Sequence, residues 1–216
     1  MTGTILERQD TTYLDEQLLG SSGHLQLFNA DDYDQIPRDA LRVWCHKNAR
    51  YGLPTQELVT FVRQLIGDRR AIEIGAGHGD LAHHLSIQAT DSYLQDSPEI
   101  SAYYAIIGQP RVQYPPSVER LEAMEAIDKY RPDVVVASWV TQIGDETIPD
   151  SCTWGVNELL LLQKVKTYIV IGNDNVHGGK MILQLPHLTF RPTWLRSRAS
   201  DPTKEVIHVW NSMWIR

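Results

Sequence analysis

The chain has 216 residues, of which 42% are apolar, so it is long enough for one sizeable α/β domain and too apolar to be disordered. Its formal net charge of −7 gives no overall basic field, which disfavours nucleic acid as a partner. The two cysteines, Cys45 and Cys152, provide neither a disulfide framework nor a zinc spacing, and the absence of a signal peptide or a long apolar run predicts a cytoplasmic protein with no metal and no membrane partner.

The chain is predicted to divide into two parts. Residues 1–35 show little periodicity and are expected to form a loosely ordered arm, with a short helix at Tyr13–Leu19. The rest, residues 36–216, is expected to form a single domain. Its first helix is predicted at Asp39–Lys47, and a second amphipathic helix ends at Gly67.

Strand and helix patterns then alternate. The predicted strands are Arg70–Ile74, Ser86–Thr90, Arg111–Tyr114, Asp133–Ser138 and Tyr168–Ile171. The predicted helices that follow them include Pro98–Ile107, Val118–Tyr130, Trp154–Val165 and Lys180–Leu185. This alternation predicts an α/β fold with a doubly wound, mostly parallel sheet, because parallel strands need helical crossovers. Two extended segments near the C-terminus, Thr189–Leu195 and Val206–Trp210, are expected to close it as an antiparallel hairpin.

A glycine-rich turn follows the first predicted strand. Gly75, Gly77 and Gly79 precede a helix, which lets the backbone approach a ligand closely and directs unpaired N–H groups toward it. Glu73 stands two residues before the first glycine, and Asp91 ends the next strand. An acid at that position can accept hydrogen bonds from the ribose hydroxyls of a nucleoside.

The series Glu73-x-Gly75-x-Gly77-x-Gly79, followed by Asp91, resembles the first two motifs of class I S-adenosylmethionine-dependent methyltransferases. The resemblance implies a Rossmann-like methyltransferase fold, S-adenosylmethionine as cofactor, and ribose binding by Asp91. The residues expected at the cofactor site are Glu73, Gly75, Ala76, Gly77, Gly79, Asp91, Ser92, Ser117 and Trp139.

The sequence differs from that family at the position expected to contact the adenine. Many members carry an acid at the end of the third strand, whereas the stretch after Tyr114 has none directly there. Ser117, a backbone group or Glu119 is left to take this contact.

The sequence indicates the cofactor more clearly than the methyl acceptor. The Asn/Asp-Pro-Pro-aromatic turn used for amino-group methylation is replaced by Ser138-Trp139-Val140-Thr141-Gln142, and neither cysteine fits a Pro-Cys nucleophile. A small molecule or a protein side chain is therefore the expected acceptor. His177, after the fifth strand, is a candidate general base, with a purely structural loop histidine as the alternative. Trp139 is expected either to wall the acceptor pocket or to pack beneath the loop.

Two other functions remain open. A non-catalytic S-adenosylmethionine-binding protein or partner subunit would keep the same turn. An NAD-dependent oxidoreductase would need the pattern G-x-G-x-x-G, whose third glycine is replaced here by Asp80, and a carboxylate there would face the pyrophosphate. The sequence leaves undetermined the acceptor, the oligomeric state and whether residues 1–35 form a lid.

Overall fold

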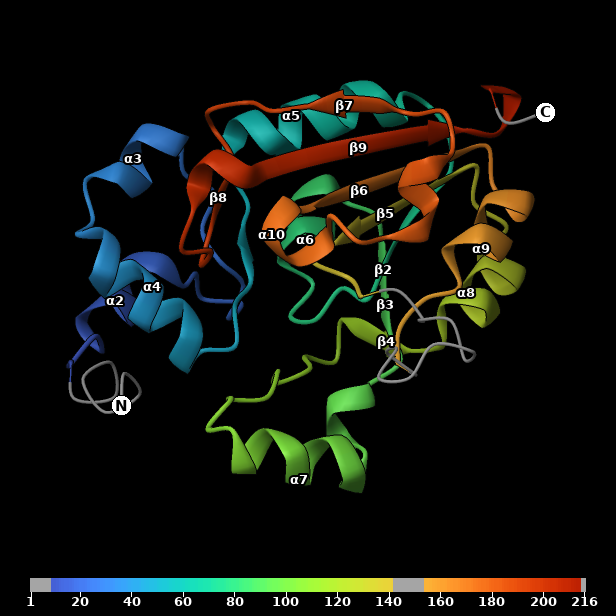
Figure 1. Cartoon of the computed structure of the whole chain (residues 1–216). Helices are drawn as coiled ribbons and strands as arrows, with labels where there is room; N and C mark the ends of the chain where they lie inside the picture. The colour runs from blue at the N-terminus through green and yellow to red at the C-terminus, as the bar shows by residue number, and fades with distance from the viewer. Residues whose placement is uncertain (1–8, 142–153, 215–216) are drawn as a thin grey trace.

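A computed structural model describes residues 9–141 and 154–214 and places them in an α/β fold around one mixed sheet (Figure 1). The strands of this sheet are β2 (Ala71–Ile74), β3 (Gln88–Asp91), β4 (Val118–Arg120), β5 (Val134–Ser138), β6 (Thr167–Asn173), β7 (Leu188–Phe190) and β9 (Glu205–Asn211). Their order is β4-β3-β2-β5-β6-β9-β7. The five neighbouring strands β4, β3, β2, β5 and β6 pair in parallel, and β9 runs antiparallel to both β6 and β7. The predicted mostly parallel sheet with an antiparallel C-terminal hairpin is confirmed.

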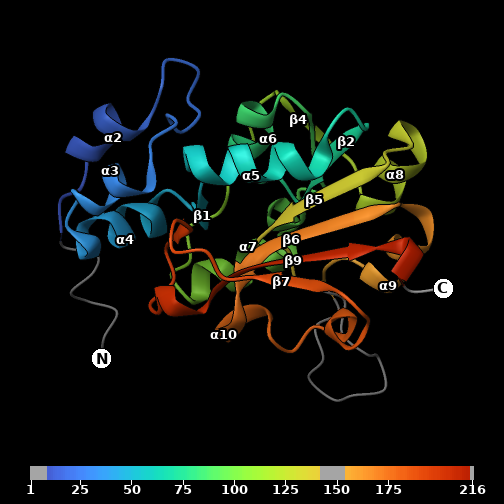
Figure 2. The same ribbon diagram turned by 90° about the horizontal axis from the view of Figure 1, so that it is seen from above.

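Helices cover both faces of the sheet (Figure 2). One face packs against α5 (Gln56–Ile66) and α6 (Asp80–Leu85). The other packs against α8 (Ala123–Tyr130), α9 (Glu158–Lys164) and the 3₁₀ helix η2 (Met181–Gln184). Strand β5 is buried on both sides, which explains why its sequence is continuously apolar instead of alternating.

The N-terminal segment differs from the loose arm that the sequence predicts. Its described part contains α2 (Tyr13–Leu18) and α3 (Ala30–Asp34), which pack with α4 (Arg38–Lys47). The cluster buries Leu14, Leu18, Leu25, Tyr33, Ala40, Leu41, Trp44, Cys45 and Leu53. These apolar residues lack local periodicity because they meet only through tertiary contacts. The domain boundary after residue 35 stays a prediction, and Cys152 lies outside the described residues.

Short elements connect this cluster to the rest of the chain. The two-residue strand β1 (Gly52–Leu53) pairs antiparallel with β8 (Arg196–Ser197). The remaining short elements are η1 (Leu94–Asp96), α10 (Asp174–His177), η3 (Pro202–Lys204) and η4 (Ser212–Trp214). Among the residues that the structure describes, no helix has the length and apolarity needed to cross a membrane.

The third strand of the sheet is not where the sequence predicts it. Residues 111–114, predicted as a strand, form an irregular segment, and the strand is instead β4, at the start of the predicted helix Val118–Tyr130. That helix, α8, begins five residues later, where Glu122 and Glu125 form a capping box. Pairing with β3 decides the outcome, because only residues 118–120 lie in register with Ala89–Asp91.

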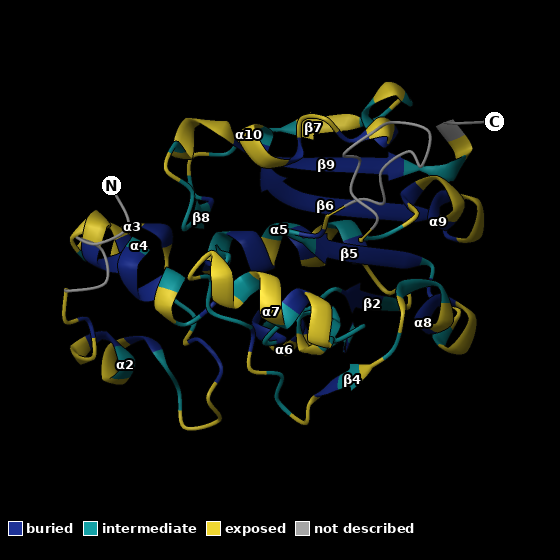
Figure 3. Ribbon diagram, turned by 60° about the horizontal axis from the view of Figure 1, so that its bottom comes forward, coloured by how far each residue is buried: buried dark blue, intermediate teal, exposed yellow. Residues whose placement is uncertain are grey.

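Helix α7 (Pro98–Ile106) is set apart from the helices that cover the sheet (Figure 1), and most of its visible surface is exposed (Figure 3). Ile100 is its one buried residue, whereas Tyr103, Ile106 and Ile107 are more than half exposed. The segment after α7, residues 107–117, returns to the sheet at β4. It passes over the glycine turn on the way, with Val112 beside Gly77.

Candidate cofactor site at the glycine turn

The turn between β2 and α6 depends on its glycines. Gly75, Gly77 and Gly79 have φ values of 56°, 56° and 71°, a left-handed region that side chains with a Cβ rarely adopt. A Cβ at Gly75 would lie 2.6 Å from Val140 Cγ2, and one at Gly79 would lie 2.8 Å from Val118 Cγ2. Ala76 N–H donates to Thr90 O at 3.0 Å, which ties the turn to β3.

Glu73 stabilises the helix that follows this turn. Its carboxylate is 2% exposed and accepts a hydrogen bond from Ala82 N–H at 2.8 Å, so it holds the first turn of α6. Burial raises the pKa of Glu73 to about 8, which favours the protonated acid at neutral pH. Its hydrogen bond is with the protein backbone, and its predicted role in cofactor binding stays a prediction.

Asp91 lies beside the turn, as the sequence predicts. Its Oδ2 accepts from Gly77 N–H and its Oδ1 accepts from Tyr93 N–H, both at 2.9 Å. The carboxylate, half-buried at the end of β3, is therefore fixed against the middle glycine. Burial raises the pKa of Asp91 and outweighs these two hydrogen bonds, which lower it. Ser92 lies between Asp91 and Tyr93 in this bend. The structure thus brings together the turn and the acid, which the sequence separates.

A tyrosine that the sequence did not single out covers Asp91. The Tyr114 ring stacks on the Tyr93 ring with centroids 3.9 Å apart and an interplanar angle of 7°. A side-chain hydrogen bond with Tyr114 also lowers the pKa of Asp91. Two residues earlier, Val112 is buried, and its methyl groups lie 3.8 Å from the position that a Cβ on Gly77 would take. The segment therefore covers both the turn and the acid.

Ser117, one of the groups predicted to contact the adenine, does not join this group. Its Oγ lies 3.4 Å from His24 Nε2, and both line a separate hollow with His83 that does not include Asp91. The acid after the true third strand is Glu122, at the N-cap of α8. Leu121, the residue before it, donates its N–H to Asp91 O at 2.9 Å, so Glu122 follows directly on a contact with Asp91. Burial raises the pKa of Glu122, and the charges of Glu125 and Asp91 raise it further. Glu122 is not predicted from the sequence, because the third strand is predicted at residues 111–114 and lies at residues 118–120.

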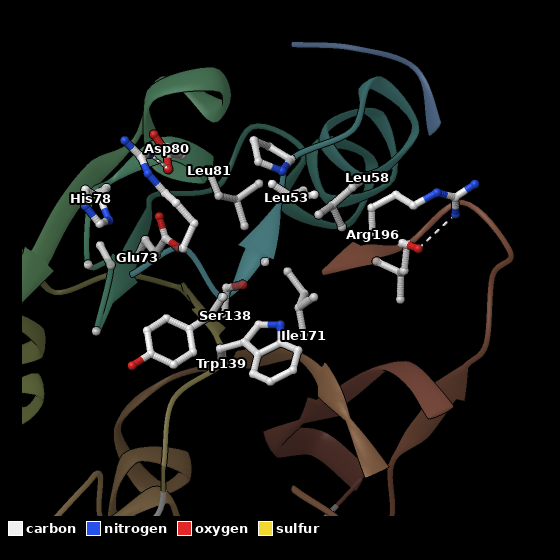
Figure 4. A pocket seen from close by; sticks show the side chains of 18 of the residues that line it. Leu53, Leu58, Glu73, His78, Asp80, Leu81, Ser138, Trp139, Ile171 and Arg196 are labelled. Carbon is white, nitrogen blue, oxygen red and sulfur yellow. Dashed lines mark hydrogen bonds and ion pairs between the residues drawn. The ribbon is translucent and has the colours of Figure 1, made fainter. Parts of the chain in front are cut away.

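A cavity lies beside the glycine turn, which lines it together with Glu73 and His78, and its other wall comes from the end of β5. Ser138 and Trp139 form this wall, beside Ile171 of β6 (Figure 4). Trp139 has a φ of 61°, a strained conformation for a bulky residue. Its ring is 6.3 Å from that of Tyr51 and 5.3 Å, edge to face, from that of His177. Gln142, at the end of this predicted edge, lies outside the described residues.

His177, the predicted base, lies behind Trp139 and is not among the residues lining the cavity. It is 4% exposed, and its Nδ1 accepts from Asn173 N–H at 3.1 Å. Its Nε2 is buried with no hydrogen-bond partner among the described residues. Burial, together with the nearby Lys180, lowers the pKa of His177 to about 4, so the imidazole is neutral at pH 7. Its role as a base stays a prediction.

A carboxylate that the sequence analysis missed does line the cavity. Glu205, the first residue of β9, is 4% exposed and pairs with Asn173 across the antiparallel ladder. Its Oε1 accepts from Ser197 Oγ, and from Asn173 Nδ2 at 3.4 Å. Burial raises its pKa. No local motif marks Glu205, because the glycine turn and β9 meet only in the folded sheet.

Asp80 joins the N-terminal cluster to the turn. Its carboxylate pairs with Arg50 and accepts from Leu25 N–H at 2.9 Å, while His24 Nδ1 lies 3.5 Å away. These partners outweigh burial and hold the pKa of Asp80 well below its usual range. The carboxylate that would face the pyrophosphate in an NAD-binding site thus pairs with Arg50.

Comparison with known proteins adds distant structural similarities. No family model matches the chain, and no curated protein matches it. Similar solved structures include precorrin-6y C5,15-methyltransferase from Geobacter metallireducens, with 14% identity, a TM-score of 0.38, and coverage of 74% of this chain and 90% of that one. An rRNA methylase from Streptococcus thermophilus has 13% identity, a TM-score of 0.36, and coverage of 71% and 93%. The 16S rRNA methylase ArmA has 15% identity, a TM-score of 0.34, and coverage of 94% and 97%.

These matches correct one prediction. The acidic composition predicts that nucleic acid is an unlikely partner, yet the similar structures include two rRNA methylases. Net charge averages the surface and does not describe the groups beside one pocket. The prediction against nucleic acid is therefore wrong. The strand order, the antiparallel β9 and the glycine turn after β2 match the Rossmann-like methyltransferase fold that the sequence predicts.

Proposed function

We propose that the chain is an S-adenosylmethionine-dependent methyltransferase that binds its cofactor between the glycine turn and Asp91. The observation that supports this most strongly is the pair of hydrogen bonds that hold the Asp91 carboxylate against Gly77 and Tyr93, both at 2.9 Å. A carboxylate fixed at a glycine turn suits a ligand that carries vicinal hydroxyls. It also tolerates a cationic sulfonium and would repel a pyrophosphate.

The residues present fit this cofactor. The left-handed glycines keep side chains out of the space beside the turn, and Asp91 is placed to accept from ribose hydroxyls. Tyr93 and Glu122 flank Asp91 and would receive the adenine, the first through its ring face and the second through its carboxylate. The cofactor would supply an electrophilic methyl group, and the end of β5 would border it.

Cofactor binding requires Tyr114 to move. A hydroxyl beside Asp91 and a flat ring stacked on Tyr93 are the two features that an adenosine would present at this position. The nucleoside and Tyr114 would therefore compete for the same two residues. We infer that the side chain of Tyr114 rotates away from Asp91 and Tyr93 when the cofactor binds.

The acceptor would enter between Trp139 and Glu205. Methyl transfer needs in-line positioning of donor and acceptor, with a base where the acceptor loses a proton. Glu205 lines the cavity and has a raised pKa, so it is a candidate for this role alongside the predicted His177. His177 contacts the Trp139 ring and is suited to fixing this wall of the cavity. The compartment proposed for this activity is the cytoplasm.

A non-catalytic S-adenosylmethionine-binding protein is the second candidate. The observation that favours it is the occupation of Asp91 and Tyr93 by Tyr114. Both candidates predict cofactor binding, and only the first predicts methyl transfer.

Isothermal titration with S-adenosylmethionine, S-adenosylhomocysteine and NAD tests the cofactor assignment. We expect S-adenosylmethionine and S-adenosylhomocysteine each to bind at one site, and NAD to give no heat of binding. Binding of NAD alone, or no heat from any of the three, would contradict the proposal. Transfer of a radiolabelled methyl group to an acceptor then separates the enzyme from the binding protein.

A further inference from the structure

A second cavity opens on the other side of Arg50 and His78, which line both it and the cofactor cavity. Its volume is about 370 Å³. Three cationic side chains line it, from three segments of the chain: Lys47 at the end of α4, Arg50 before β1, and Arg111 in the segment that follows α7. His24 also lines it, and none of its described lining residues is an acid. In a chain with a net charge of −7, this is a local concentration of positive groups.

We propose that this cavity binds a phosphate group carried by the methyl acceptor. The inference rests on the proposed methyltransferase function and names a chemical feature of its substrate. A phosphate offers several oxygen acceptors to donors that approach from different directions, which matches lysine and arginine side chains from separate segments.

Arg50 provides an independent indication of a missing acceptor. Its side chain is 7% exposed, its Nη1 pairs with Asp80, and its Nη2 donates to Gly23 O at 3.1 Å. Its Nε is buried and has no hydrogen-bond partner among the described residues. A buried, unsatisfied guanidinium N–H is unfavourable, and Arg50 lines both adjoining cavities, so an anionic oxygen bound there would lie beside this guanidinium.

The remaining cations retain donors for a ligand. Lys47 is exposed, and its Nζ donates one hydrogen bond, to Gln9 O at 2.7 Å. Arg111 is half-buried, and its Nη1 pairs with Asp96 at 3.1 Å. An ammonium has three donors and a guanidinium has five, so both can bind an oxyanion without losing these contacts.

The second cavity adjoins the cofactor cavity, so we assign the phosphate to the methyl acceptor and not to an unrelated ligand. Because Arg50 and His78 form the wall between the two cavities, a phosphate here would lie next to the glycine turn. The same position raises one alternative, that Arg50 binds the carboxylate of the cofactor itself. The two cases differ in whether a phosphate and S-adenosylhomocysteine bind together.

Calorimetric titration of the full chain with four probes tests the proposal. The probes are inorganic phosphate, uridine 5′-monophosphate, a uridine hexaribonucleotide and, as the uncharged control, uridine. We expect the phosphate-bearing probes to bind, more weakly as salt is raised, and uridine not to bind. Tighter binding of the hexamer than of the monophosphate would identify nucleic acid as the source, and equal binding would identify a small phosphorylated molecule.

A matched pair of variants localises the binding. The double variant Lys47→Ala/Arg111→Ala should weaken phosphate binding by about tenfold. The control variant Lys129→Ala/Lys204→Ala removes two cations that do not line the cavity and should bind as the parent does. Both variants should bind S-adenosylhomocysteine as the parent does, which separates failure of this proposal from failure of the cofactor assignment.

Three results would overturn the proposal. They are no binding of any phosphate-bearing probe, equal binding by the parent and the Lys47/Arg111 variant, and displacement of the bound phosphate by saturating S-adenosylhomocysteine. The last would assign the cavity to the carboxylate of the cofactor.

Discussion

The ring of Tyr114 lies parallel to that of Tyr93 with their centroids 3.9 Å apart, and this pair covers the carboxylate of Asp91. Tyr114 reaches this position from an irregular segment that joins α7 to β4. Val112 extends the same cover to Gly77. The chain thus places its own aromatic and hydroxyl groups where the proposed cofactor would place an adenine and a ribose.

Replacing Tyr114 should therefore strengthen cofactor binding. In Tyr114→Ala, S-adenosylhomocysteine no longer competes with a side chain for Asp91, and we expect its dissociation constant to fall about fivefold by calorimetry, because a larger fraction of the protein is competent to bind. Tyr103→Ala is the control, since that side chain is 55% exposed on α7. Weaker binding by Tyr114→Ala would mean that Tyr114 is part of the cofactor site.

Replacing Asp91 should weaken cofactor binding. Hydrogen bonds to a charged group contribute about 1.5–3 kcal/mol, so Asp91→Ala should raise the dissociation constant of S-adenosylhomocysteine by about ten- to a hundredfold. Asp91→Asn should lose less, because its amide oxygen still accepts one bond. Asp96→Asn, in the same bend but exposed, provides the control. Equal affinities for all three variants and the parent would remove Asp91 from the site.

The buried Glu73 predicts a pH dependence of stability. Its pKa is about 8 in the folded protein, and near 4.5 when exposed, so from pH 4.5 to 8 the unfolded chain releases a proton that the folded chain keeps. This group therefore lowers the free energy of unfolding as pH rises through that window. Glu73→Gln should remove this component and stabilise the protein at pH 8 by on the order of 2 kcal/mol.

Urea denaturation of the parent and Glu73→Gln at pH 5 and pH 8 measures this effect. The glutamine can still accept from Ala82 N–H, so the two proteins should be closest in stability at pH 5. Glu119→Gln serves as a control, because the carboxyl of Glu119 is paired with Lys129 at the surface and its pKa is lowered. A constant difference between parent and Glu73→Gln at both pH values would show that Glu73 is ionised in the folded state.

Replacing His177 should change the surroundings of Trp139 more than it changes cofactor affinity. The imidazole is buried against Trp139 and lies outside the lining of the cavity, so His177→Ala should leave the affinity for S-adenosylhomocysteine within about twofold. The cavity it leaves should lower the free energy of unfolding by about 1–3 kcal/mol and change the fluorescence of Trp139. Once an acceptor is identified, a hundredfold loss of turnover that formate or imidazole restores would instead support the base role.

Local signals in the sequence determined the outline of the fold and the cofactor turn. Gly75, Gly77 and Gly79 follow a β-strand and open a helix, and their backbone requirement is visible in the residue type itself. The continuous apolar run of β5 likewise predicted a strand covered on both faces. Such features depend on neighbours in the chain, so they can be read without knowing the fold.

Tertiary structure alone decided what surrounds the turn. Whether residues 111–114 or 118–120 pair with β3 depends on register, and that choice moved the edge acid to Glu122 and freed Tyr114 to cover Asp91. Glu205 and Arg50 reach the cavity from opposite ends of the chain. Neither carries a local motif, because their positions follow from long-range packing and strand pairing, which leave no pattern in the residues on either side.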